Sequence, residues 1–172
     1  MKNKGIIFFI FTCFFFCAIF VQCGGKSEED LLRETIEKIG DYAEDRELSG
    51  ILPHLAEDYS DEEGRTFAEV AALLETYLQG YRGIAVNVLG TRILSLAVPD
   101  AELETDVALS SGAAKLFRKT VRYSGQFYRF KMSWVKEEET WKCKTASWKF
   151  IPLDELFPES FKILEKLFPG TF

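Results

Sequence analysis

The chain has 172 residues, with 27 acidic and 21 basic side chains and a formal net charge of −6 at pH 7. This length suits one domain with a proper core and is too short for two ordinary ones. The negative charge disfavours nucleic acid or another polyanion as a partner.

The amino end is typical of an export signal. Two lysines precede a run from Gly5 to Val21 that is apolar apart from Thr12, and a basic start followed by an apolar core is what secretion requires. We therefore predict a signal peptide over residues 1–22. An uncleaved signal anchor is the alternative, because the run reaches the lower end of the spanning range.

The next residues carry the most specific motif. Phe20-Val21-Gln22-Cys23, followed by two glycines, resembles a bacterial lipobox, although that family prefers a small residue at the position of Gln22 and Leu at that of Phe20. The resemblance implies that Cys23 is acylated, for example with palmitate, and that residues 23–27 form a flexible tether. The protein would be exported and held at a bacterial membrane, facing the periplasm or the cell surface.

Cysteine usage agrees with lipidation. Four cysteines are present, and only Cys23 and Cys143 remain once the signal is removed. With Cys23 lipidated, Cys143 lacks an intramolecular partner. Its neighbours Lys142 and Lys144 point to the opposite face of their strand, so we expect a buried, unreactive thiol rather than a nucleophile.

Charge is distributed unevenly along the mature chain, whose net charge is −8 because the signal removes two lysines. Lys26–Glu69 contains 15 acidic and five basic residues, whereas Lys115–Lys149 contains ten basic and three acidic residues. We expect mutual attraction between these parts and solvated faces. The alternative is a basic sheet surface facing anionic lipid or an acidic partner.

Three helices are expected early in the mature chain. Apolar residues recur at helical spacing over Glu28–Asp45. A short second helix is expected over Ser49–Leu55. The third opens with a capping box at Thr66 and Glu69 and ends near Gly80.

Between the second and third helices, Asp58–Gly64 invites comparison with a calcium loop. Its glycine stands at the seventh position rather than the sixth, and no Glu follows at the twelfth. We expect a capping loop, with no metal site and no cofactor in the chain. The lone His54 is expected to be structural.

Strands follow from Gly83 onward. Apolar and polar residues alternate over 84–98, with a bend at Gly90, and again over 103–109. Two longer strands form a hairpin over Val121–Ile151 around an acidic turn. In the first of them, one face carries an alternating apolar set: Tyr128, Phe130, Met132 and Trp134.

This order predicts an α+β protein: three helices on one face of a curved antiparallel sheet of four strands or more. It resembles the nuclear transport factor 2-like superfamily, which includes ketosteroid isomerase-like and polyketide cyclase-like members. The resemblance covers Ser27–Ile151, including Asp58–Asp61 and the closing strand Trp141–Trp148. It implies a cone-shaped domain over residues 28–151 with a pocket at its open end.

Members of the superfamily use the cone for catalysis, for binding a ligand or peptide, or for dimerisation through the sheet. Its enzymes need an Asp or His beside Tyr donors, and the spacing here places no such set, because Asp106 lies on the charged side of its strand. We predict no catalytic residue. The candidate pocket-lining residues are Tyr42, Tyr77, Tyr81, Tyr128, Phe130 and Trp134.

Residues 152–172 form an amphipathic tail that we expect to close over the cone mouth or the sheet edge, with membrane docking as an alternative. Together, these features predict a lipid-anchored, non-enzymatic module that binds a small apolar ligand or a protein partner. The alternatives are an isomerase- or dehydratase-type enzyme and a structural homodimer formed through the sheet.

Overall fold

The computed structural model describes residues 25–80, 83–111, 126–156, 158–159 and 162. In chain order, its helices and strands are α2 (Glu28–Asp45), α3 (Leu48–Ile51), the 3₁₀ helix η2 (Leu52–His54), β1 (Leu55–Asp61), α4 (Phe67–Gly80), β2 (Ile84–Ala97), β3 (Asp100–Ser111), β4 (Gln126–Glu137), β5 (Thr140–Phe150) and α5 (Leu153–Leu156). None of the described helices is long and apolar enough to cross a membrane.

Helix α2 has the predicted bounds and a complete capping box. The Ser27 hydroxyl accepts a hydrogen bond from the Asp30 amide at 3.1 Å, and the Asp30 carboxylate accepts one from the Ser27 amide at 3.2 Å. At the start of α4, the Glu69 carboxylate accepts hydrogen bonds from the Thr66 amide and hydroxyl, each at 2.8 Å. These bonds satisfy amides that would otherwise lack partners at the two helix starts.

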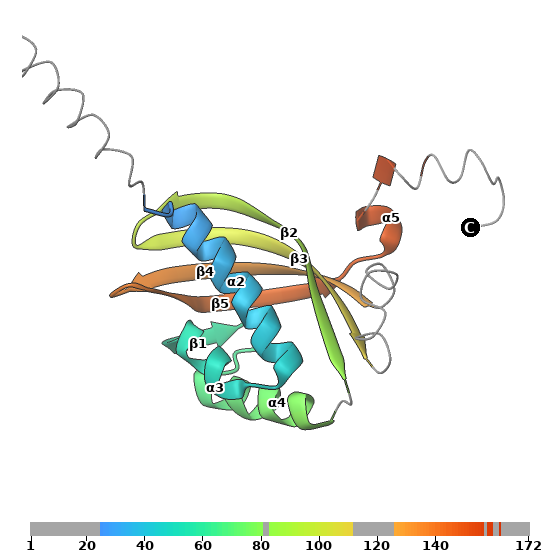
Figure 1. The fold of residues 1–172 in the computed structure, drawn as a ribbon, viewed down its shortest axis with the longest axis horizontal. Coiled ribbons are helices and arrows are strands. Elements are labelled where there is room, and N and C mark those ends of the chain that lie inside the picture. Colours follow the sequence, from blue (N-terminus) through green and yellow to red (C-terminus); the bar gives the residue numbers. More distant parts are fainter. Residues whose placement is uncertain (1–24, 81–82, 112–125, 157, 160–161, 163–172) are drawn as a thin grey trace, which may run out of the picture.

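The sheet has five strands in the order β1-β5-β4-β3-β2, and α2 crosses one of its faces while α3 and α4 lie beside the β1 edge (Figure 1). Strands β2 to β5 form the predicted antiparallel meander, and the bend expected at Gly90 is an irregularity between Val88 and Gly90. The part of the predicted hairpin before Gln126 lies outside the described residues.

Strand β1 corrects the prediction of a purely antiparallel sheet. It also takes up the first part of the capping loop expected at Asp58–Gly64, whereas the residues after Asp61 form a turn before α4. Residues Leu55–Asp61 pair in parallel with β5, so the sheet is mixed. Asp58, the first residue of the expected loop, is a solvent-exposed position of this edge strand, whereas Tyr59 and Asp61 are buried.

The core lies between α2 and the covered face of the sheet, which we call the inner face. It is centred on two buried tryptophans, Trp134 from β4 and Trp141 from β5. The other buried members of this cluster are Leu32, Ile36, Tyr59, Val70, Ala101, Leu103, Cys143 and Ala146. Burial of apolar surface on this scale is the main force that holds α2 on the sheet.

Polar contacts fix the position of α2. The Glu28 carboxylate accepts hydrogen bonds from Lys136 Nζ at 2.6 Å and from Trp141 Nε1 at 3.1 Å. The hydrogen bond from Lys136 is the main reason why the pKa of Glu28 lies below its ordinary value. Near the other end of the helix, the Glu44 carboxylate accepts from the Val86 amide at 2.8 Å.

The described part of the carboxyl-terminal tail lies on the opposite, outer face of the sheet rather than at the cone mouth. Leu156 of α5 packs against Ala108, Phe127 and Ile151, which form a second small buried cluster. Residues 157, 160–161 and 163–172 lie outside the described residues. The described start of the tail therefore covers one end of the outer face.

Two glycines offer a matched test of this packing. A methyl group on Gly50 would lie 2.5 Å from the Tyr42 ring, whereas one on Gly40 would make ordinary contacts at 3.5 and 3.7 Å with Val86 and Val88. We expect Gly50→Ala to lower the free energy of unfolding by about 1–3 kcal/mol because the ring must move. Gly40→Ala should raise it by about 0.5–1 kcal/mol because alanine favours the helix. Urea unfolding measures both, and a stabilising Gly50→Ala would contradict the observed contact.

Candidate functional site

Two carboxylates are buried among the described residues: Glu44 of α2, which binds the Val86 amide, and Asp61 at the end of β1. The Asp61 side chain is fully buried and lies 2.6 Å from the Arg65 guanidinium. It also accepts hydrogen bonds from the amides of Glu63 at 3.0 Å and Arg65 at 2.9 Å. These bonds close the turn that leads into α4.

The environment of Asp61 keeps it ionised. Burial opposes the charge, but the hydrogen bonds and the positive charge of Arg65 outweigh that effect, so the pKa of Asp61 lies below its ordinary value. A general base needs a pKa near the working pH and access to a substrate proton. Asp61 has neither, so its arrangement is that of a structural ion pair.

Arg65 also contacts the aromatic end of the inner face. Its guanidinium carbon lies 5.0 Å from the centroid of the Trp148 ring, within cation–π distance. Trp148 in turn lies 6.1 Å from Phe130, measured between ring centroids. The pair of Asp61 and Arg65 thus joins the start of α4 to β5.

The structure places the candidate pocket-lining residues in different environments. Trp134 is 2% exposed and belongs to the core, Tyr42 lies against Gly50, and Tyr77 is 52% exposed on α4. Tyr128 and Phe130 do come together, 6.5 Å apart between ring centroids, in a group with Trp148 and Phe150. Tyr81 and Cys23 lie outside the described residues.

Cys143 is buried, as predicted from its strand position. Burial raises the pKa of its thiol to about 12. The flanking Lys142 and Lys144 pair instead with Glu137 at 2.6 Å and Asp58 at 3.0 Å. Because a thiol with so high a pKa stays protonated, Cys143 is a poor nucleophile.

Neither His54 nor the acidic side chains of the described residues form a catalytic or metal site. Nδ1 of His54 lies 3.3 Å from the backbone oxygen of Trp141, a contact that ties η2 to β5. Within the ranges that the structure describes, no three His, Cys, Asp or Glu side chains are grouped so that they could hold a metal ion.

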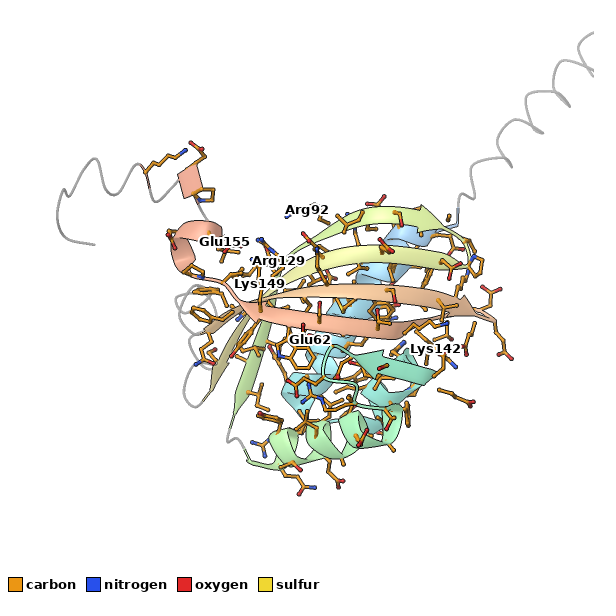
Figure 2. All side chains as sticks on the ribbon, turned by 180° about the vertical axis from the view of Figure 1, so that it is seen from behind. Glu62, Arg92, Arg129, Lys142, Lys149 and Glu155 are labelled. Carbon is orange, nitrogen blue, oxygen red and sulfur yellow. The ribbon has the colours of Figure 1, made fainter. Side chains whose placement is uncertain are left out.

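The outer face of the sheet, which Figure 2 shows from the side opposite α2, carries two open hollows. These adjoining hollows of about 460 and 300 Å³ share Glu62, Lys131 and Ser147. We call them together the outer groove. Leu94 of β2 and Glu62 beyond β1 flank its floor, which is formed by β3, β4 and β5.

The strand register arranges this floor in three rows, each with one residue from β3, β4 and β5. The rows are Glu102-Ser133-Thr145, Glu104-Lys131-Ser147 and Asp106-Arg129-Lys149. Because side chains alternate along a strand, these residues point away from the core residues Leu103 and Met132. The sequence showed the alternation in each strand, but only the register brings the rows together.

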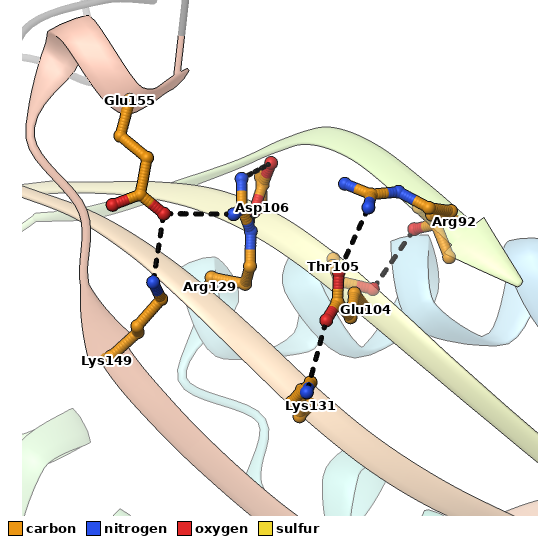
Figure 3. Close-up of polar contacts among 9 residues, drawn as sticks. Arg92, Glu104, Thr105, Asp106, Arg129, Lys131, Lys149 and Glu155 are labelled. Carbon is orange, nitrogen blue, oxygen red and sulfur yellow. Dashed lines mark hydrogen bonds and ion pairs between the residues drawn. The ribbon is translucent and has the colours of Figure 1, made fainter. Parts of the chain in front are cut away.

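The charges in the rows are largely paired. Glu104 lies between Arg92 at 3.3 Å and Lys131 at 3.5 Å, while Asp106 binds Arg129 through two hydrogen bonds of 2.7 and 3.0 Å (Figure 3). The hydrogen bond to Asp106 is the main reason why the pKa of Arg129 is raised.

The tail completes the third row. Glu155 of α5 bridges Arg129 at 3.1 Å and Lys149 at 2.9 Å (Figure 3). The basic segment of the sequence therefore does not form an unopposed basic surface on these strands. The outer groove offers alternating donors and acceptors rather than a uniform charge.

Comparison with known proteins gives matches only at the level of structure. No protein-family model and no curated protein matches the sequence. A candidate scytalone dehydratase from Novosphingobium aromaticivorans superposes with a TM-score of 0.60 at 14% identity, covering 73% of this chain and 85% of that one. An NTF2-like protein from Cytophaga hutchinsonii gives 0.57 at 14% identity, covering 73% of this chain and 100% of that one.

A third solved structure, a candidate dehydratase of the NTF2-like family from Streptomyces avermitilis, gives a TM-score of 0.58 at 10% identity. It covers 71% of this chain and 94% of that one. At these identities the likeness concerns the fold. The chain has the nuclear transport factor 2-like fold that its element order predicted.

The buried ion pair of Asp61 and Arg65 predicts how the stability of the fold depends on pH. Because the pKa of Asp61 is lower in the folded than in the unfolded chain, the pair stabilises the fold above pH of about 4 and this contribution is lost as pH falls through the folded value. Asp61→Asn should lower the free energy of unfolding by about 2 kcal/mol at neutral pH. The deficit should shrink in acid.

Urea unfolding at neutral and acidic pH measures this deficit. Asp58→Asn is the matched control, since Asp58 forms an exposed pair with Lys144 and should change stability by less than about 1 kcal/mol. A deficit for Asp61→Asn that is the same at both pH values would show that the charge of Asp61 is not what matters.

Proposed function

We propose that this chain is a lipid-anchored protein of a bacterial cell envelope that binds a protein partner in its outer groove without chemical turnover. The observation that supports binding at this place is the groove itself, with three rows of exposed and half-buried polar side chains on one face of the sheet. Protein surfaces recognise such rows through hydrogen bonds and complementary charge.

The chemistry of the groove favours a protein over a small apolar ligand. Ligand pockets for apolar molecules are enclosed and lined mainly by apolar side chains. Here the floor contains Ser133 and Thr145, whose hydroxyl oxygens lie 2.6 Å apart, and charged residues stand on both sides of them. An extended segment of a partner would find donors and acceptors along the whole floor.

The inner face supports the same conclusion. Trp134 and Trp141 fill the space beneath α2, and the oxygens of the buried Asp61 are engaged by Arg65 and by backbone amides. An isomerase or dehydratase would need a carboxylate or histidine in hydrogen-bond reach of a substrate there. That second candidate function is favoured by the two neighbours of similar fold that are described as candidate dehydratases.

Site-specific photo-crosslinking in the native host tests the groove. We expect a photoreactive amino acid at Leu94 or Thr145, which line the groove, to form an adduct with one partner. The same amino acid at Glu37, on the exposed side of α2, should not. Lys131→Glu should weaken the adduct because it reverses the charge shared by the two hollows.

The pattern of adducts separates the alternatives. Adducts of equal strength at Leu94 and Glu37 would contradict a specific groove. An adduct of twice the mass of the chain would instead indicate the homodimer through the sheet. Turnover of a small substrate that survives Lys131→Glu would favour the enzyme.

Lipidation has its own test. Cys23→Ala should abolish incorporation of a labelled fatty acid and move the protein from the membrane to the soluble fraction, because the thiol that would carry the lipid is gone. Cys143→Ala is the matched control and should leave both unchanged, since Cys143 is buried. A Cys23→Ala protein that stays in the membrane would show instead that the apolar run over 5–21 is an uncleaved anchor.

A further inference from the structure

The distance between the lipid and the folded domain is short. Ser27 is fixed by the capping box of α2, and only three residues separate it from Cys23. A fully extended chain gains at most about 3.6 Å per residue, so the tether spans about 14 Å. If Cys23 is lipidated as proposed above, the start of α2 cannot lie farther than that from the headgroups.

Two turns of the sheet lie beside the start of α2 (Figure 1). The Lys136 amide donates to the Pro99 oxygen at 2.7 Å, and Lys136 Nζ binds Glu28 at 2.6 Å. Lys136 thus joins the start of α2, the turn between β2 and β3, and the end of β4. We call this end of the domain the tethered pole, comprising Ser27–Asp30, Val98–Asp100 and Glu137–Glu139.

The tethered pole exposes one apolar side chain, which has acidic residues around it. Val98 is 56% exposed, one of the four large hydrophobic side chains with high exposure among the described residues. Glu137, Glu138 and Glu139 follow at the neighbouring turn, and the Glu139 side chain is 93% exposed. A single valine gains by contact with the headgroup region. Glu137 pairs with Lys142 and Glu139 with Lys136, but with Glu28, Glu29, Asp30 and Asp100 the pole remains net acidic, so it resists deeper burial and is repelled by anionic lipid.

We propose that the lipidated protein stands upright on the bilayer, with Val98 at the level of the headgroups and the acidic turn just outside them. This orientation rests on the proposed lipidation of Cys23. The opposite end of the domain, where α2 ends at Asp45, lies about 27 Å away along a helix of 18 residues. If the protein instead lay with its outer face on the bilayer, the ion pairs of Glu104 and Asp106 would lose their hydration.

The upright orientation determines how the outer groove is presented. Strand β3 begins at the tethered pole with Asp100 and runs away from it, and β4 ends there with Glu137. The strands therefore run away from the membrane surface rather than parallel to it. The groove opens sideways, where a neighbouring protein on the same membrane can reach it.

Depth-dependent fluorescence quenching tests the orientation. Full-length lipidated protein in the Cys143→Ala background carries a dye at Val98→Cys or, as a second site on the pole, Glu139→Cys. Glu47→Cys, an exposed position between α2 and α3, is the matched control. With spin-labelled headgroups in phosphatidylcholine vesicles, we expect quenching at both pole sites to be several-fold stronger than at Glu47. Equal quenching at the three sites, or stronger quenching at Glu47, would overturn the proposal.

Different results would contradict the proposed lipid anchor and the proposed orientation. Loss of vesicle binding in Cys23→Ala supports the anchor, and persistent binding would contradict the proposed function. Vesicle binding with uniform quenching would contradict only the orientation.

Vesicles of different lipid charge test whether the acidic residues of the tethered pole set its distance from the bilayer. Phosphatidylglycerol at low salt should weaken quenching at Val98, and added salt should restore it because it screens the repulsion. The triple variant Glu137→Gln, Glu138→Gln, Glu139→Gln should reduce this salt dependence, while the acidic residues of Ser27–Asp30 and Asp100 remain. Undiminished salt dependence in the triple variant would show that these carboxylates do not set the distance from the bilayer.

Discussion

The structure depends on the burial of Trp134 and Trp141 beneath α2. Both indoles need an apolar cover, and Leu32 and Ile36 of α2 supply it, while Glu28 accepts the Trp141 N–H and ties the helix to β4 through Lys136. This packing uses the inner face of the sheet for stability. The same strands present their other side chains on the outer face, which forms the outer groove.

Much of the fold follows from local patterns in the sequence. The bounds of α2 were predictable because a capping box and an apolar stripe act within one helix, and the meander was predictable from its period of two. Strand β1 was not, because its parallel pairing with β5 joins residues that are distant in the sequence, and the exposed acids of Leu55–Asp61 are typical of a loop as well as of an edge strand.

The site was less predictable than the fold for a similar reason. Alternation placed Tyr128, Phe130 and Trp134 on one face, but it could not show that α2 covers the Trp134 end while Tyr128 remains partly exposed. The rows of the outer groove arise only when three strands adopt one register. Asp61 looked like a loop acid, and its fully buried pair with Arg65 depends on the turn that both residues close.

The side chains of α2 also reach the free edge of the sheet, where Glu44 binds the Val86 amide and Arg33 binds the Thr91 oxygen. Unpaired edge strands can add strands from other molecules, which leads to aggregation. By occupying backbone groups of β2, α2 hinders the addition of a strand from another molecule at this edge of the sheet. The helix that shelters the tryptophans therefore also protects the protein from aggregation.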